Sequence, residues 1–193
     1  MVGDQASSTQ GRPLRLFVAV EAPEDVRELV RTGVEPIRER HPKGRWVPNA
    51  DQHVTLKFLG TVSPSSVAPA IDAIGGVAAR YPPFETRVRE LGAFPSARRA
   101  RTLWVGLDDP ASRLARLAVS LDEALARDFP PEDRAFTPHL TVARFDPPVP
   151  LEDLGALALE SRPFDVSWLT LYRSHLRRPA PRYEALATFP LAG

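Results

Sequence analysis

Cysteine is absent from the 193-residue chain, which excludes a disulfide framework, a thiol nucleophile and every cysteine-ligated metal site. No apolar run approaches the roughly 20 residues that a helix needs to cross a bilayer. The first 13 residues lack the apolar stretch of a signal peptide, so residues 1–13 are predicted to be a disordered lead-in. These absences favour a cytoplasmic protein without a membrane segment.

Charge of one sign is not in excess either, because 25 Lys and Arg face 24 Asp and Glu, a formal net charge of +1. Such a chain is not expected to hold nucleic acid by bulk electrostatics over a long footprint. Two segments nevertheless carry basic residues and no acid: 91–107, with Arg98, Arg99 and Arg101, and 173–183, with Arg173, Arg177, Arg178 and Arg182. They indicate either a small anionic ligand site or solvated arginine loops.

The remaining composition, 43% hydrophobic and 25% charged, is that of a folded globular domain. Apolar runs predict strands at 14–20, 52–59, 84–91, 102–107, 138–145, 164–172 and 183–189. Helical spacing and start signals predict helices from Pro23 to His41, Ser63 to Arg80, Asp109 to Leu125 and Leu151 to Glu160, the last with Leu151, Leu154, Leu157 and Ala158 facing inward. The third is the best defined, with Leu114, Leu117, Leu121 and Leu125 on one face and Asp109 and Pro110 at its start.

The order of these elements repeats. Strand, helix, strand, helix, strand runs from Leu14, and the same order recurs from Thr102 with one more strand at the end. An approximate internal duplication of α+β lobes is the simplest architecture for residues 14–193.

Two related motifs lie in equivalent strands of the two halves. His53-Val54-Thr55-Leu56 and His139-Leu140-Thr141-Val142 are 86 residues apart, and each reads His, apolar, Thr, apolar. Strand side chains alternate between faces, so each His and Thr share one face while the apolar residues enter the core. The two polar pairs are expected to face a shared cleft.

Two histidines can act as an acid and a base without a metal, because imidazole titrates near neutral pH. Two threonine hydroxyls on the same face would hold a phosphoryl group between the imidazoles, an arrangement suited to adding or removing the alkoxide of a phosphodiester. Zinc is the competing use of paired histidines, but Asp51 and Asp146 flank the strands without a recognisable ligand spacing. Neither a metal nor a cofactor is predicted.

These motifs and their flanks resemble the 2H phosphoesterases, specifically the RNA 2',3'-cyclic phosphodiesterase group (LigT-like, ThpR), once called 2'-5' RNA ligases. The resemblance rests on segments 45–47, 53–60, 102–106, 138–144 and 171–174 within about residues 14–191. It implies a bilobal α+β fold in which two pseudo-symmetric lobes, with antiparallel sheets lining a central cleft and helices outside, form a single domain. It implies metal-independent opening of an RNA or nucleotide 2',3'-cyclic phosphate to a 2'-phosphomonoester.

The resemblance also implies roles for individual residues. One histidine activates water and the other protonates the departing 3'-oxygen; His53 is taken as the acid and His139 as the base, although the pseudo-symmetry leaves the reverse order open. Thr55 and Thr141 hold phosphoryl oxygens. Arg144 matches a phosphate-contacting arginine of the family, but strict alternation would point it away from the His139 face, so that role requires a bulge or the strand's end.

Other residues have a less specific signal. Lys57 shares the His53 face by strict alternation and is a further candidate for the phosphate. Arg98, Arg99 and Arg101 are candidates for guiding an RNA end. Core positions are predicted for the three tryptophans, Trp46, Trp104 and Trp168. Surface positions are predicted for His41 and His175, of which His175 is the better candidate for a ligand contact.

Three interpretations of the function stay open on the sequence. Beside cyclic phosphate hydrolysis, the same groups could join RNA ends 2'-5' or hydrolyse another cyclic or 2'-5'-linked nucleotide. A binding module for nucleotides or RNA ends that has lost turnover is the alternative from another class. Nothing in the sequence resembles a coiled coil, so a monomer is expected.

Overall fold

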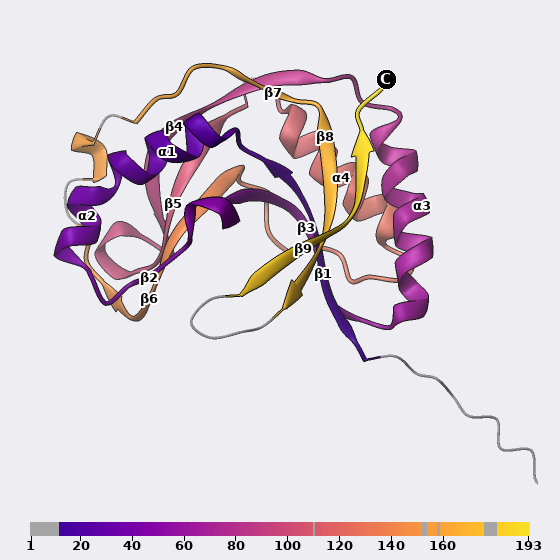
Figure 1. Ribbon diagram of the computed structural model, residues 1–193, viewed down its shortest axis with the longest axis horizontal. Coiled ribbons are helices and arrows are strands. Elements are labelled where there is room, and N and C mark those ends of the chain that lie inside the picture. The colour runs from indigo at the N-terminus through magenta and orange to yellow at the C-terminus, as the bar shows by residue number, and fades with distance from the viewer. Residues whose placement is uncertain (1–11, 110, 152–153, 158, 176–180) are drawn as a thin grey trace, which may run out of the picture.

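The computed structural model describes residues 12–193 except 110, 152–153, 158 and 176–180 (Figure 1). The predicted lead-in, Pro110, Ala158, Arg177 and Arg178 therefore lie wholly or largely outside the described residues. The strands are β1 (Leu14–Glu21), β2 (Arg45–Trp46), β3 (His53–Val62), β4 (Phe84–Phe94), β5 (Ala100–Asp108), β6 (His139–Val149), β7 (Phe164–Val166), β8 (Trp168–His175) and β9 (Arg182–Pro190). The helices are α1 (Glu24–Gly33), α2 (Glu35–Arg40), α3 (Val67–Ala78) and α4 (Arg113–Leu125), with short 3-10 turns η1 (Asn49–Asp51), η2 (Pro64–Ser66), η3 (Ala97–Arg99) and η4 (Leu154–Ala156).

In the described part of the chain, nine strands form an antiparallel sheet in the order β7-β4-β5-β6-β3-β1-β8-β9, with β2 beside β6. The order β6-β5-β4-β7 in one half repeats as β3-β1-β8-β9 in the other, and each series starts with a histidine strand. The ladder between β3 and β6 consists of the pair Val54 and Leu140. The molecule therefore has two lobes with equivalent strand orders, and the sheet runs from one lobe to the other through the short β3–β6 ladder.

The helices do not follow this division by sequence. α3 packs against α4, β8 and β9, and α4 also packs against β3, so both helices cover the first lobe although α4 lies in the second half of the chain (Figure 1). α1 lies beside the second lobe, where Arg162 bonds to Asp25 and a Cβ at Gly33 would meet Leu159 (Figure 1). Thus α4, from the second half of the chain, covers the first lobe, and α1, from the first half, lies beside the second lobe.

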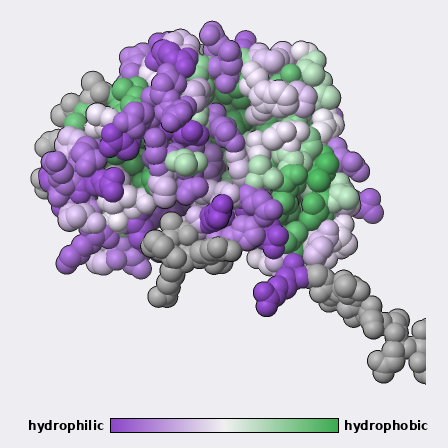
Figure 2. Space-filling view, in the orientation of Figure 1, coloured by the Kyte–Doolittle hydropathy of each residue, from purple (hydrophilic) through white to green (hydrophobic). Residues whose placement is uncertain are grey.

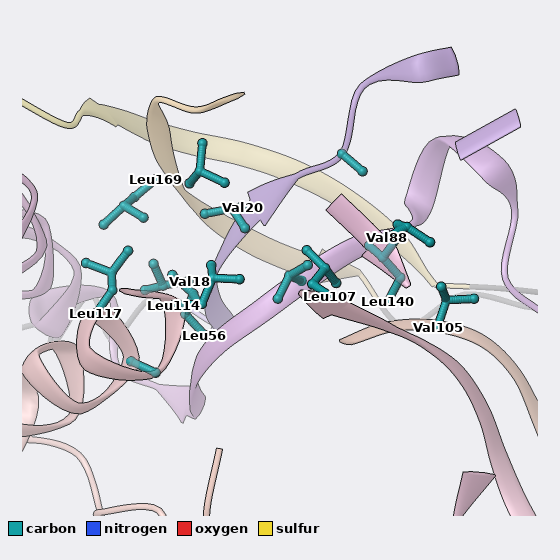
Figure 3. Packing of buried hydrophobic residues seen from close by; sticks show 14 of the residues in the cluster. Val18, Val20, Leu56, Val88, Val105, Leu107, Leu114, Leu117, Leu140 and Leu169 are labelled. Carbon is teal, nitrogen blue, oxygen red and sulfur yellow. The ribbon is translucent and has the colours of Figure 1, made fainter. Parts of the chain in front are cut away.

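A continuous hydrophobic core fills both lobes. Figure 3 shows Leu114 and Leu117 of α4 beside Val18 and Leu56 in the first lobe, and a second group around Val105 in the other. β1 is apolar on both faces, since residues 16–20 are buried in the core on one side and, on the other, Phe17 lies under the rings of His53, Tyr172 and Tyr183. This double burial explains why its sequence is a continuous apolar run rather than an alternating one.

The first predicted helix is divided and the third is shifted. α1 ends and α2 begins around Val34, because Pro36 has no N–H to donate into a continuous helix. α4 begins at Arg113, four residues after Asp109, whose carboxylate nevertheless caps it by accepting bonds from the amides of Arg113 (2.6 Å) and Ala115 (3.1 Å).

The predicted helix at Leu151–Glu160 is wrong in the residues that the structure describes, which form the turn η4 and an isolated β-bridge between Glu160 and Arg89. Its backbone forms hydrogen bonds with neighbouring segments instead of within a helix: the Leu151 amide donates to the Ala97 carbonyl, and the Leu159 carbonyl accepts a bond from the Glu90 amide. Leu151, Leu154 and Leu159 are buried, so the apolar spacing reflects a segment packed on the β4 side. The predicted strand 164–172 is likewise two strands, because β7 pairs with β4 and β8 with β1.

None of the helices in the described ranges is long and apolar enough to cross a membrane. The face shown in Figure 2 is mainly hydrophilic, with its largest hydrophobic area over α3.

Candidate active site

A bulge in β6 decides where Arg144 points. Leu103 pairs with Ala143 but Trp104 pairs with Thr141, so Val142 is an extra residue in the ladder. The extra residue reverses the alternation after it. Arg144 therefore returns to the face of His139 and Thr141, and all three line the same cleft.

β3 carries the same irregularity at the equivalent position. Val18 pairs with Lys57 and Ala19 with Thr55, which leaves Leu56 as the extra residue. Phe58, 86 residues before Arg144, consequently joins the cleft face, where it is 50% exposed.

Lys57 is turned away by this bulge, so its predicted place on the face of His53 is wrong. Lys57 is 1% exposed, and its ammonium donates to the Asp122 carboxylate and, at 2.6 Å, to the Pro130 carbonyl. Lys57 does not line the cleft and is not available to a phosphate bound there.

The cleft has a volume of about 1160 Å³ and takes its walls from both lobes. It receives side chains from the first lobe through β1, β3, β8 and β9, from the second through β4, β5 and β6, and from α4 and the residues that follow α4. The residues that carry the chemistry argued below are His53, Thr55, Phe58, Arg15 and Tyr183 on one side and His139, Thr141, Arg144, Arg101 and Phe94 on the other.

His53 is held among aromatic rings. Phe17 stacks on it with ring centroids 4.7 Å apart, and Tyr183 meets it edge-on at 5.1 Å. Burial among these rings lowers the pKa of His53 to about 4; a hydrogen bond with the Asp51 backbone and the charge of Glu21 oppose the shift, and His139 adds to it. His53 is therefore neutral in the free protein at pH 7.

His139 has a related setting with a smaller shift. Its Nδ1 lies 2.7 Å from the Thr137 carbonyl oxygen, which can only accept, so Nδ1 carries the proton and Nε2 is free. Phe94 meets the ring edge-on at 5.3 Å. Burial lowers the pKa of His139, the bond to Thr137 raises it, and the charge of Arg144 lowers it again.

The imidazole of His139 is thus oriented by the backbone carbonyl two residues before it, and the Asp51 backbone, two residues before His53, raises the pKa of His53. His53 and His139 line the same cleft, and the charge of His139 lowers the pKa of His53. The arrangement can present two oriented, ionisable nitrogens and two hydroxyls to one bound group, which is what phosphodiester cleavage by acid and base requires.

Arginines supply positive charge around these groups. Arg144 is exposed, and its guanidinium lies 3.4 Å from the Thr102 hydroxyl. Arg15, Arg101 and Arg134 also line the cleft. Arg101 is 3.6 Å from Asp146, whereas Arg98 and Arg99 do not line the cleft, so only one arginine of the predicted guiding group reaches it.

The remaining predicted residues lie as follows. His175 bonds to Glu184 at 2.7 Å and does not line the cleft, and His41 packs against Phe145. Trp46 and Trp104 are partly buried, whereas Trp168 is 56% exposed, so its predicted core position is wrong.

Several cleft residues were not predicted from the sequence. Arg15 interrupts the apolar run of β1 two residues before Phe17, and that interruption was the available signal. Phe58 could have been found by applying the bulge argument for Arg144 to the other motif. Phe94 and Tyr183 carried no comparable signal, because their places depend on neighbouring strands.

No group of three or more His, Asp or Glu side chains in the described ranges comes together in a way that could hold a metal ion.

Comparison with known proteins gives a consistent result. The chain matches the family model described as the 2'-5' RNA ligase superfamily over residues 22–178. The RNA 2',3'-cyclic phosphodiesterase of Geobacillus stearothermophilus is 34% identical over 181 residues, 92% of this chain but 57% of that protein, so this chain spans little more than half of that relative. The RNA 2',3'-cyclic phosphodiesterase of Methanothermobacter thermautotrophicus is 31% identical over 184 residues, 92% of this chain and 99% of that protein.

Solved structures agree in fold. The protein TT0787 of Thermus thermophilus has a TM-score of 0.76 at 30% identity, covering 93% of this chain and 98% of that chain. Escherichia coli LigT complexed with 3'-AMP has a TM-score of 0.69 at 29% identity, covering 94% and 99%. The predicted resemblance and the α+β fold are confirmed.

Proposed function

The chain belongs to the 2'-5' RNA ligase superfamily, and we propose that its cleft opens the 2',3'-cyclic phosphate of an RNA end or nucleotide to a 2'-phosphomonoester. The observation that carries the proposal is that both His-apolar-Thr motifs, from different lobes, present their polar side chains to one cleft. The names of the relatives support the same reaction.

In the proposed reaction a water oxygen attacks phosphorus, and the bond from phosphorus to the 3'-oxygen breaks. One imidazole takes the proton of the water and the other gives a proton to the departing oxygen. Thr55, Thr141 and Arg144 hold the non-bridging oxygens, whose negative charge they stabilise. No metal takes part in this scheme.

The difference between the two histidines favours His53 as acid and His139 as base. The pKa of His53 is lowered further than that of His139, so protonated His53 is the stronger acid and neutral His139 the stronger base. The productive form needs a proton on His53, which the negative charge of a bound phosphodiester favours.

Exposed aromatic rings support a substrate that carries a nucleobase. Phe58 and Phe94 are 50% and 38% exposed and line the cleft from opposite lobes. Base stacking on such rings contributes about 1–3 kcal/mol and tolerates any base.

The test uses short RNA with a 2',3'-cyclic phosphate in large molar excess over the protein. Turnover of the excess is expected, and His53→Ala or His139→Ala should each lower it by roughly two to four orders of magnitude. His175→Ala is the matched control and should turn over normally, because His175 lies outside the cleft. Stoichiometric protection of the cyclic end without turnover would instead identify a binding module.

The order of the two roles has its own test. With a nucleoside phosphodiester that releases p-nitrophenolate, the leaving group needs no proton. His53→Ala should then lose much less activity than on the cyclic phosphate, and His139→Ala should lose about as much. The opposite pattern would reverse the assignment.

A monomeric state and a cytoplasmic location remain predictions from the sequence.

A further inference from the structure

Lys57 is a buried charge that the proposed reaction does not use. It is the only charged residue among the buried polar side chains of the described ranges, although it lies two residues after Thr55. An ammonium group is removed from water at high cost unless partners surround it. Its partners therefore indicate what this lysine does.

Both partners belong to the segment that leads into the other histidine strand. Asp122 lies in the last turn of α4, and Pro130 lies just beyond the helix. The same carboxylate oxygen of Asp122 also accepts the Glu132 amide at 3.1 Å. Through these hydrogen bonds, Lys57 and Asp122 together hold the beginning of segment 130–137 in place.

Segment 130–137 has no helix or strand, yet it forms one wall of the cleft. Its end holds the catalytic ring, because the Thr137 carbonyl accepts the bond from His139. Within the described residues, the hydrogen bonds of this segment are those to Lys57, Asp122 and His139. Loss of the first two leaves the wall with a hydrogen bond only at its far end.

The strand pairing between the two lobes is short beside the histidines, since the β3 and β6 ladder is the single pair Val54 and Leu140. A second link through Lys57 runs from the strand of His53 to the segment that orients His139. We propose that Lys57 is a positioning residue, which fixes the 130–137 wall and thereby the spacing and orientation of the two imidazoles. The inference rests on the proposed function.

The test compares Lys57→Met, which keeps the length of the side chain without its charge, with Tyr81→Phe. Tyr81 also anchors α4, through bonds to the Arg116 carbonyl and the Ser120 hydroxyl, but does not touch segment 130–137. Lys57→Met should lower kcat by about 10-fold to 100-fold, as misplacement of reacting groups by ~1 Å does. Tyr81→Phe should leave kcat unchanged.

A second readout needs no substrate. ¹⁵N NMR of neutral His139 should show the proton on Nδ1 in the wild-type protein and a mixture of tautomers in Lys57→Met. Asp122→Asn keeps the shape and an acceptor oxygen, so it tests the tie if Lys57→Met does not fold, with a smaller loss of kcat in the same direction.

Unchanged kcat and an unchanged His139 tautomer in a folded Lys57→Met protein, with only a lower melting temperature, would overturn the proposal and leave Lys57 a structural residue. Absence of turnover in the wild-type protein would be a failure of the proposed function instead, and the NMR comparison would still test the tie.

Discussion

His53 should make the folded protein lose stability as the pH falls below about 6.5, and the size of the loss follows from its surroundings. Rings of Phe17 and Tyr183 bury the imidazole and lower its pKa from the ordinary 6.5 to about 4. The unfolded chain then takes up this proton at a higher pH than the folded chain does, so acid favours unfolding. The effect begins near pH 6.5 and is complete below about pH 4.

One pKa unit corresponds to about 1.4 kcal/mol, so at pH 5 the 1.5 units below the ordinary value amount to about 2 kcal/mol. Urea unfolding at pH 7 and pH 5 measures this loss in the wild-type protein and in His53→Gln, which has no titrating imidazole there. The wild type should lose about 2 kcal/mol more than His53→Gln over this interval. His41→Gln keeps His53 and should behave as the wild type does.

Equal pH dependence in the wild type and in His53→Gln would refute the reasoning, because it would mean that the cleft does not disfavour the imidazolium. A direct NMR titration of His53 provides the same answer residue by residue. Addition of inorganic phosphate should move the titration to higher pH if the anion binds beside the ring.

Three further predictions concern single residues. Arg144→Ala should raise KM for a cyclic-phosphate RNA by about 10-fold to 100-fold through loss of a charge-assisted hydrogen bond; steady-state kinetics measures it, and an unchanged KM would remove Arg144 from the phosphate site. Asp109→Ala should lower the free energy of unfolding by about 1 kcal/mol, since Asp109 caps a helix; urea unfolding that matches the wild type would contradict this cap. Gly92→Ala should cost about 1–3 kcal/mol, because the new Cβ would lie 2.1 Å from the Trp104 ring; a stable variant with normal turnover would show that this ring moves freely.

Much of the fold could be predicted because the strands and the best helix carry strong local patterns. The apolar run of β1 and the leucine repeat of α4 consist of residues that are buried in the structure. The periodicity of these residues therefore predicts a strand and a helix with approximately correct bounds. The same reasoning failed at 151–160, where leucines with helical spacing pack on β4 and the backbone bonds to neighbouring segments. Apolar spacing reports which side chains are buried, and it does not report where the backbone bonds go.

The sequence predicts the positions of the His and Thr residues, which come before the β-bulges, but not the positions of all the site residues that follow the bulges. Strict alternation placed His53 with Thr55 and His139 with Thr141, and the need for a bulge before Arg144 could be stated from the sequence. Strict alternation does not include the matching bulge at Leu56, and for that reason it predicts Lys57 on the wrong face. The covering of the first lobe by α4 had no sequence signal, because the order of elements is the same whichever lobe a helix covers.

The identity of the product tests the proposed reaction most directly. Purified protein in EDTA is given an excess of short RNA ending in a 2',3'-cyclic phosphate, and the new end group is identified by phosphorus NMR. The proposed reaction gives catalytic formation of a 2'-phosphate. A 3'-phosphate, or a cyclic end that stays intact in the presence of folded protein, would contradict it.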